Sequence, residues 1–403
     1  MNIDDYIRAT KRNIYALNPR YLEDEEILGL LSQLASDIDP SLIIKPIFST
    51  NIFPEMVHLE KSTYLLWDMH FWDIYKIMLT TNFLLYENDL TENPKSVSSS
   101  EILNFATERY RIIFLDVLTS KLRRHPKVAY RLAQEQFFYR KLANKNSNQF
   151  EYSFSEQRSL EITSIILLAK LFVFFHEIHH DYLKIDEQYR LDVIELQQEV
   201  ANIIMEKIDF SKTSASSRTI EALKRRAYKD SATLEESTCD FCAFKLAYKY
   251  ISMIMPDLDH QKTLEWLYTA LATCIGFVEV MNYLEIFWDT TMNQFQNYYL
   301  GSDLKLDDIY NQINSYEAKM QNRVSFLSFA IYANLSHTGV DISQSIFRKG
   351  EKIVRYITQF TQTFLDFEFL ATINHDAQNL KTKNSSPNYF HEAINLLLGN
   401  PYE

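Results

Sequence analysis

The chain has 403 residues, of which 46% are apolar and 14% aromatic, so it can build a sizeable core and is not a disordered chain. Its formal net charge of −12 argues against a nucleic-acid-binding protein, because such proteins usually present a basic face. The three cysteines form no disulfide framework and residues 1–17 lack the order of a signal peptide, so we expect a cytoplasmic protein.

The first hundred residues are predicted to combine helices with a small sheet. Residues 1–35 have apolar residues spaced among charges, as in amphipathic helices. The stretch SLIIKPIFS (41–49) is rich in β-branched residues, and the proline within it indicates an edge strand. EMVHLE (55–60) and STYLLWD (62–68) flank a short polar turn and predict a hairpin. We therefore expect a small sheet near residues 41–68.

The rest of the chain is predicted to be mainly helical, with helices over 69–87, 101–143, 157–184 continuing to about 207, 231–254 and 262–296. Residues 162–175 and 264–288 are apolar enough to resemble membrane spans. The first is too short and the second carries glutamates that are costly in lipid, so both are predicted to be buried helices. The predicted fold class is mainly α (α+β), with an N-terminal segment 1–100, a core 101–300 and a helical region 301–403.

Residues 176–180 read HEIHH, an H-E-x-x-H motif that follows an apolar run. On a helix His176 and His180 share one face, because residues four apart are neighbours. Two neutral imidazoles are good zinc ligands, and Glu177 is angled to take a proton from water at the metal. The motif predicts a zinc site with Glu177 as the base; the alternative is a helix end with surface histidines and a coincidental glutamate.

A site with two histidines needs a third protein ligand. Residues 234–247, LEESTCDFCAFKLA, are predicted to be helical, and Glu236 and Asp240 lie there one turn apart. Glu236 is the preferred third ligand, and Glu235 is its rival because it aligns less well with Asp240. Asp240 is predicted to accept the second ring N–H of a ligating histidine and so fix the orientation of that ring.

Three further residues in these two segments, His179, Cys239 and Cys242, have side chains of types that bind metals. His179 is rotated away from the ligand face of its helix, and we expect it at the surface or just outside the ligand set. Cys239 and Cys242 form a single C-x-x-C pair. With His176 and His180 they would make a closed structural zinc site that leaves no place for water. The preferred interpretation is that both cysteines pack in the core.

HEIHH followed by E-x-x-x-D on a later helix resembles the gluzincin zinc metallopeptidases. With E-x-x-C-D-x-x-A, the pattern is also similar to the Lit-like intracellular peptidases of phage exclusion. The resemblance covers only the region of these motifs. It implies a zincin-like helical core beside a small sheet whose edge strand binds extended substrate. It implies Zn²⁺ held by His176, His180 and Glu236, Glu177 as general base, and Asp240 as the orienting group.

The function that this resemblance implies is a zinc-dependent endopeptidase that cleaves a protein substrate in the cytoplasm, in phage defence or as a toxin. The alternative is a non-catalytic zincin-like protein, or an interaction protein with a structural zinc. The expected partner is a protein substrate, with no nucleic acid and no membrane. The sequence predicts neither the oligomeric state nor the scissile bond.

Overall fold

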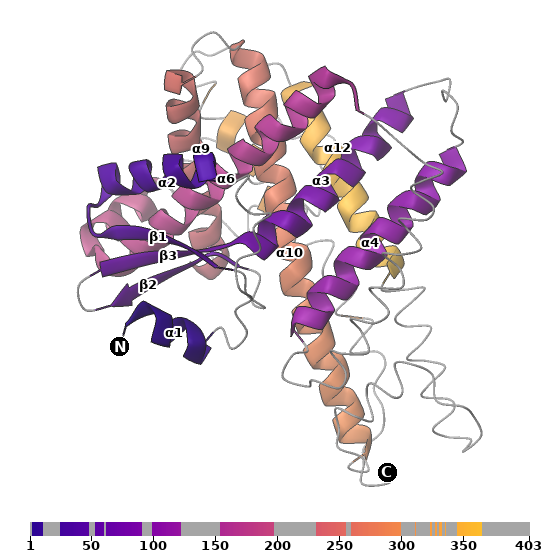
Figure 1. Cartoon of the computed structure of the whole chain (residues 1–403), viewed down its shortest axis with the longest axis horizontal. Helices are drawn as coiled ribbons and strands as arrows, with labels where there is room; N and C mark the ends of the chain where they lie inside the picture. Colours follow the sequence, from indigo (N-terminus) through magenta and orange to yellow (C-terminus); the bar gives the residue numbers. More distant parts are fainter. Residues whose placement is uncertain are drawn as a thin grey trace.

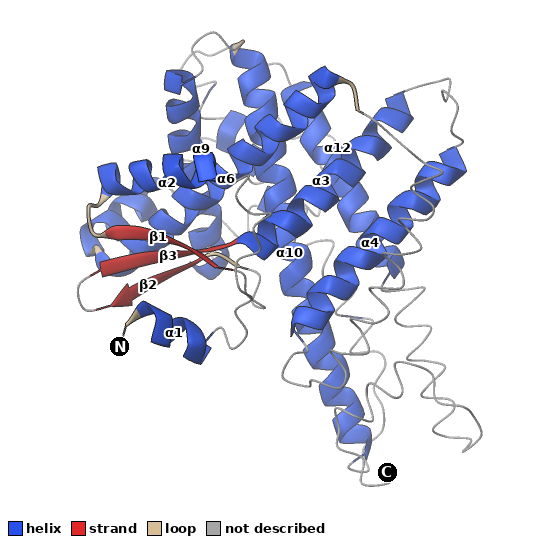
Figure 2. Cartoon of the chain, in the orientation of Figure 1, coloured by secondary structure: helices blue, strands red, loops and turns tan. Residues whose placement is uncertain are grey.

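The structure, a computed structural model, is mainly helical with one three-stranded sheet (Figure 1, Figure 2). This confirms the predicted mainly α, α+β fold class with a small sheet near residues 41–68. The structure describes residues 2–10, 25–47, 53–59, 62–90, 99–121, 154–196, 231–254, 259–299, 311, 323–324, 327–328, 330–332, 335 and 345–364.

The described elements run in chain order through the sheet and then through long helices. They are α1 (Ile3–Thr10), α2 (Glu25–Ile38), β1 (Leu42–Ile47), β2 (Glu55–Leu59), β3 (Ser62–Asp68), α3 (Met69–Leu90), α4 (Ser99–Lys121), α6 (Glu156–Ile185), α9 (Ser231–Ile254), α10 (His260–Tyr299) and α12 (Ser345–Thr363). The predicted helices at 69–87, 157–184, 231–254 and 262–296 are thereby confirmed as α3, α6, α9 and α10. The predicted helical stretches 122–143 and 197–207 lie outside the described residues.

The sheet has the strand order β1-β3-β2, with β1 parallel and β2 antiparallel to β3. Strands β2 and β3 form the predicted hairpin, with Val57 opposite Tyr64. Strand β1 is an edge strand, as predicted, and its edge position tolerates the missing N–H of Pro46. The other edge of the described sheet is β2.

Each face of the sheet is covered by helix. On one face, Ile7 of α1 packs with Val57 and Leu66 in a small cluster. On the opposite face, Leu65 and its neighbours belong to the main core together with α2. In Figure 1 the sheet and α1 lie on one side of the long helices α3, α4, α10 and α12. The sheet therefore forms one end of the described part of the molecule.

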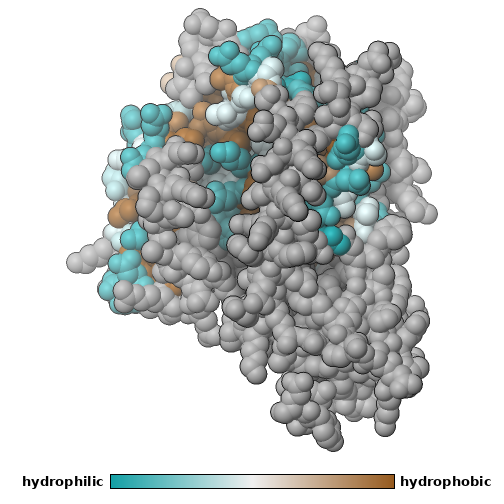
Figure 3. Space-filling model, turned by 45° about the vertical axis from the view of Figure 1, so that its right-hand side comes forward, coloured by the Kyte–Doolittle hydropathy of each residue, from teal (hydrophilic) through white to brown (hydrophobic). Residues whose placement is uncertain are grey.

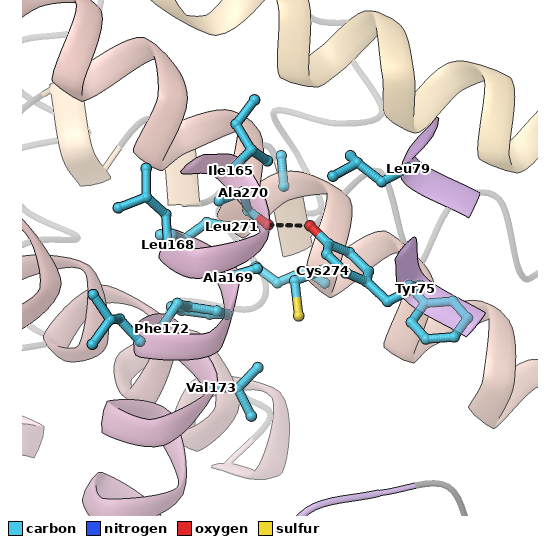
Figure 4. Close-up of a cluster of buried hydrophobic side chains, with 14 of the residues drawn as sticks. Tyr75, Leu79, Ile165, Leu168, Ala169, Phe172, Val173, Ala270, Leu271 and Cys274 are labelled. Atoms are coloured by element: carbon cyan, nitrogen blue, oxygen red, sulfur yellow. Dashed lines mark hydrogen bonds between the residues drawn. The ribbon is translucent and has the colours of Figure 1, made fainter. Parts of the chain in front are cut away.

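Helix α6 runs through the main core between α3 and α10. Ser155 caps its start, where the Ser155 side chain accepts a hydrogen bond from the backbone N–H of Arg158. Figure 4 shows Ala169 of α6 beside Cys274 of α10, with Tyr75 of α3 on the other side of Cys274; the Tyr75 hydroxyl donates to the Ala270 carbonyl oxygen at 3.4 Å. Burying one large apolar side chain stabilises the fold by about 1.5–3 kcal/mol. The N-terminal two-thirds of α6 is thus anchored before the histidines begin.

Among the described residues, two helices are long and apolar enough by composition to cross a membrane. They are Glu156–Ile185 and His260–Leu284, and 61% and 83% of their most apolar windows are buried inside the fold. Both pack in the same core cluster. The prediction that these apolar stretches form buried helices is confirmed by this packing.

The main core contains residues from all three predicted segments, including Leu31, Phe172 and Ile353. The proposed division into 1–100, 101–300 and 301–403 stays a prediction. Large apolar side chains that are exposed occur on several described elements, and Figure 3 shows polar and apolar residues together on one face. These side chains are Ile43, Leu103, Leu160, Ile185, Leu191, Ile194 and Met253. Such a spread is normal for a protein surface and does not define a docking face.

The contact between α10 and α12 depends on a glycine. A Cβ added to Gly350 would lie 2.9 Å from Cε1 of the fully buried Tyr268. We expect Gly350→Ala to lower the free energy of unfolding by about 1–2 kcal/mol, because overpacking outweighs the gain in helix propensity. Gly29→Ala is the matched control, since no atom lies within 4 Å of its added Cβ, and it should stabilise α2 by up to about 1 kcal/mol. Urea denaturation measures both changes, and equal effects of the two substitutions would contradict the packing argument.

Candidate metal centre

The two histidines of the motif lie side by side near the end of α6. The rings of His176 and His180 are 4.6 Å apart between centroids and tilted by 72°. His176 is buried, and the His180 side chain is 15% exposed. The four-residue spacing on a continuous helix gives this arrangement, as the motif predicts.

Helix α9 packs against α6 and brings the predicted carboxylate to the histidines. Oε1 of Glu236 lies 3.2 Å from Nε2 of His180, and Oε2 lies 3.5 Å from Nε2 of His176. One ligand atom from each of the three residues can be chosen so that all lie within 4.8 Å of one another. The structure therefore brings together the three residues that the sequence assigns as ligands.

The outer ring nitrogens of both histidines also face carboxylates of α9. Nδ1 of His176 lies 3.0 Å from Oδ1 of Asp240, although the contact is not in line for a straight hydrogen bond. Nδ1 of His180 lies 3.3 Å from Oε1 of Glu235. Glu235 and Glu236 thus face different nitrogens, with Glu236 on the side that the two rings share. Carboxylates behind ligating histidines fix the ring orientation and raise ligand basicity.

A buried arginine completes this network. Nη2 of Arg323 lies 2.9 Å from Oδ1 of Asp240 and 2.9 Å from Oε2 of Glu236. Its Nε lies 2.8 Å from Oδ2 of Asp240, and Nη1 lies 2.8 Å from Oε1 of Glu279 on α10. Sequence reasoning missed Arg323 because it lies 83 residues from Asp240. The available signal was a single charge at the head of the apolar run VSFLSFAIYANL (324–335).

The charges around the site reinforce one another. Burial lowers the pKa of His176, but contacts with Asp240 and Glu236 outweigh burial and raise this pKa to about 9. Burial raises the pKa of Glu236, yet the two histidines and Arg323 hold it well below its ordinary value. The Arg323 charge and His176 likewise outweigh burial and lower the pKa of Asp240. Both carboxylates are therefore ionised at neutral pH and suited to bind or support a cation.

Glu177 is half-buried beside the ligand group. Burial raises the pKa of Glu177, while the charges of His176 and His180 lower it and that of Glu236 raises it. These couplings show that Glu177 lies within electrostatic reach of all three predicted ligands. The net effect raises the pKa of Glu177 above its ordinary value, with burial as the largest cause. A carboxylate with a raised pKa is a stronger base than an ordinary one.

No family model, curated protein or solved structure matches the chain. The assignment of this site therefore depends on its residues and geometry. The donor set of two imidazoles and one carboxylate is one of those found in catalytic zinc sites, which keep the fourth position for water or substrate.

Of the two positions expected for His179, at the surface or just outside the ligand set, the structure excludes the surface position. Its side chain is buried, and Nδ1 contacts the hydroxyl of Tyr189, in the helical residues 187–196. Burial and then the charge of His176 lower the pKa of His179 to about 4, so it is neutral at pH 7. The surface alternative is wrong because the rotation that takes His179 off the ligand face carries it into the protein.

Cys239 and Cys242 are buried free thiols on α9. Burial raises the pKa of both, to about 11 for Cys242, which disfavours the thiolate that binds zinc. Among the described residues, the group with metal-ligand spacing contains no cysteine. Their burial agrees with the preferred interpretation that they pack in the core.

Strand β2 contacts α6, the helix that carries the H-E-x-x-H motif. His58 on this strand contacts Asp181 through Nε2 and lies 3.1 Å from Oγ1 of Thr63 through Nδ1. Asp181 directly follows His180 on α6. The sheet edge and the candidate site are therefore joined by a direct side-chain contact. The small sheet lies beside the motif helix, as the resemblance implies, although the His58–Asp181 contact itself has no sequence signal.

A separate cavity of about 450 Å³ lies at the other end of α6, between the first turns of α6, α10 and α12. No residue predicted for the site lines it. Lys349 at its wall is shared between Glu161 and Glu265, which satisfy its charge. The chemistry of the motif is thus located at the opposite end of α6 from this cavity.

Proposed function

We propose that the chain is a zinc-dependent metallopeptidase that cleaves a protein substrate in the cytoplasm. The observation that carries this proposal is the convergence of one ligand atom each from His176, His180 and Glu236 within 4.8 Å. Carboxylates behind both outer ring nitrogens support the same arrangement. The motif resemblance to gluzincins supplies the reaction class.

The donor set fits zinc and leaves room for catalysis. Two nitrogens and one oxygen are normal zinc donors, and three protein ligands characterise catalytic sites. The Glu236 side chain is 42% exposed, so the site can be reached from solvent. Neither buried cysteine belongs to the group, so no observation on the described residues favours the structural-zinc alternative.

The residues of the site have separate roles in peptide hydrolysis. When bound, zinc supplies a Lewis acid that polarises a carbonyl and lowers the pKa of water. The carboxylate of Glu177 takes a proton from the attacking water and delivers it to the leaving amine. Asp240 and Glu235 hold the rings of His176 and His180 so that both Nε2 atoms face Glu236.

The edge strand β2 is the proposed docking place for an extended segment of the substrate. Backbone pairing with a sheet edge is a general mode of peptide recognition. The contact between His58 of β2 and Asp181 of α6 supports this proposal, because it joins this edge to the helix that carries the motif. The similarity to Lit-like peptidases points to a host protein as substrate, in phage defence or as a toxin.

The experiment that tests this function combines metal analysis with a cleavage screen. Purified protein is analysed for zinc and incubated with cell lysate, and new protein termini are identified by mass spectrometry. We expect zinc in the purified chain, and specific new termini that vanish with a zinc chelator and with Glu177→Gln. A wild-type chain that takes up no zinc, or one that makes no termini absent from the Glu177→Gln sample, would overturn the proposal.

A further inference from the structure

Arg323 joins the candidate ligand to its supporting carboxylate through a single nitrogen. Nη2 lies 2.9 Å from both Oε2 of Glu236 and Oδ1 of Asp240. The same Oδ1 lies 3.0 Å from Nδ1 of His176. One guanidinium thus touches both carboxylates that contact His176, and its side chain is only 9% exposed.

We propose that Arg323 is a positioning residue that fixes Glu236 and Asp240 for metal binding. The inference rests on the proposed function, because it assigns a role toward the same zinc ion. Arg323 holds Oε2 of Glu236, so the other oxygen, Oε1, is the one presented beside Nε2 of His180 for coordination. The two bonds to Asp240 orient Oδ1 toward His176.

The need for such a residue follows from the charges and exposure of the site. Glu177, Glu236, Asp240 and Glu279 surround the site or its arginine, and like charges repel when they are close. The Glu236 side chain is 42% exposed, so without a partner it is free to rotate into solvent. A planar guanidinium holds its carboxylate partners in fixed directions through several separate N–H donors, whereas a lysine ammonium attracts carboxylates as a point charge and does not fix their orientation.

A cation beside a metal ligand has two opposing effects. Its charge disfavours binding of a second cation, whereas its hydrogen bonds favour binding by holding the ligand in place. Asp240 and Glu279 both pair with Arg323 and cancel its charge, and neither is a predicted ligand. Positioning therefore dominates, and removal of the arginine is expected to weaken zinc binding, not to strengthen it.

The test measures zinc affinity by competition with a chromophoric chelator for the full chain and three variants. Arg323→Lys keeps the charge and loses the planar fork; Arg323→Met loses both. We expect each to bind zinc about 10–100-fold more weakly than wild type, the range for partners behind a metal ligand. Lys349→Met is the matched control. It removes another largely buried cation that has two carboxylate partners, Glu161 and Glu265. Glu161 lies near the start of α6, whereas the histidines lie near its end, so this variant should keep the wild-type affinity for zinc.

The possible results separate this inference from the proposed function. If the wild-type chain binds no zinc, the proposed function is overturned. If it binds zinc and both Arg323 variants match it or bind more tightly, only the positioning role is overturned. Circular dichroism establishes which variants are folded, and Arg323→Lys decides the question if Arg323→Met does not fold. The visible spectrum of the cobalt-substituted chain gives a second readout, and an unchanged spectrum in Arg323→Lys would also contradict positioning.

Discussion

Glu177→Gln is expected to lower the rate of substrate cleavage by about 10²–10⁴-fold while the zinc content of the chain stays at the wild-type level. Glutamine has nearly the same shape as glutamate but cannot accept the proton of the attacking water. Glu177 is not one of the three residues whose ligand atoms converge, so its replacement should leave the metal in place. Cleavage kinetics on the substrate identified in lysate and elemental analysis of zinc provide the two measurements.

The exposed Glu187 provides the matched control for this substitution. Glu187→Gln removes the same charge from a position just beyond α6 and should change neither rate nor zinc content. Wild-type cleavage by Glu177→Gln would show that another group is the base. Loss of zinc together with cleavage would show instead that Glu177 helps to hold the ion.

His180→Ala is expected to weaken zinc binding by more than about 100-fold, because losing a ligand costs more than the 10–100-fold typical of the residues behind it. Its neighbour His179 is the comparison, since its ring contacts Tyr189 and His179 is not one of the three residues whose ligand atoms converge. His179→Ala should keep zinc and lower the free energy of unfolding by about 1–3 kcal/mol, because a buried hydrogen-bonded partner is lost. Zinc competition measures the change in affinity of the two variants, and urea denaturation measures the change in their free energy of unfolding.

The reverse pattern, in which His179→Ala loses zinc and His180→Ala keeps it, would contradict the assignment of ligands. Equal loss in both would indicate that the substitutions act through the fold of α6. Far-ultraviolet circular dichroism distinguishes that case, because both variants should retain the helix content of the wild type.

The helices were predictable because their apolar residues recur with helical spacing. The strong signals lay in α6 and α10, where long apolar stretches end in polar groups, and in the hairpin of β2 and β3. The pairing of β1 with β3 was not predictable, because nothing local specifies which strand lies between the other two.

Some residues of the candidate site could likewise be predicted from local spacing, whereas others depend on contacts between residues that are far apart in the sequence. The four-residue spacing of His176 and His180 encodes their shared face directly. The distinction between Glu235 and Glu236 required the rotation of α9 against α6, which a one-residue difference in spacing barely constrains. Arg323 could not be found from spacing at all, because a contact across 83 residues leaves no periodic pattern.

Both helices that carry the candidate ligands are secured by apolar packing. Phe172 and Phe175 of α6 and Ala243 and Phe244 of α9 belong to the same core cluster. A zinc finger, in contrast, unfolds when its ion is removed. A protein organised in this way can finish folding before it acquires the proposed zinc ion. Under that proposal it can also release zinc and rebind it, without unfolding, as the supply of zinc in its surroundings changes.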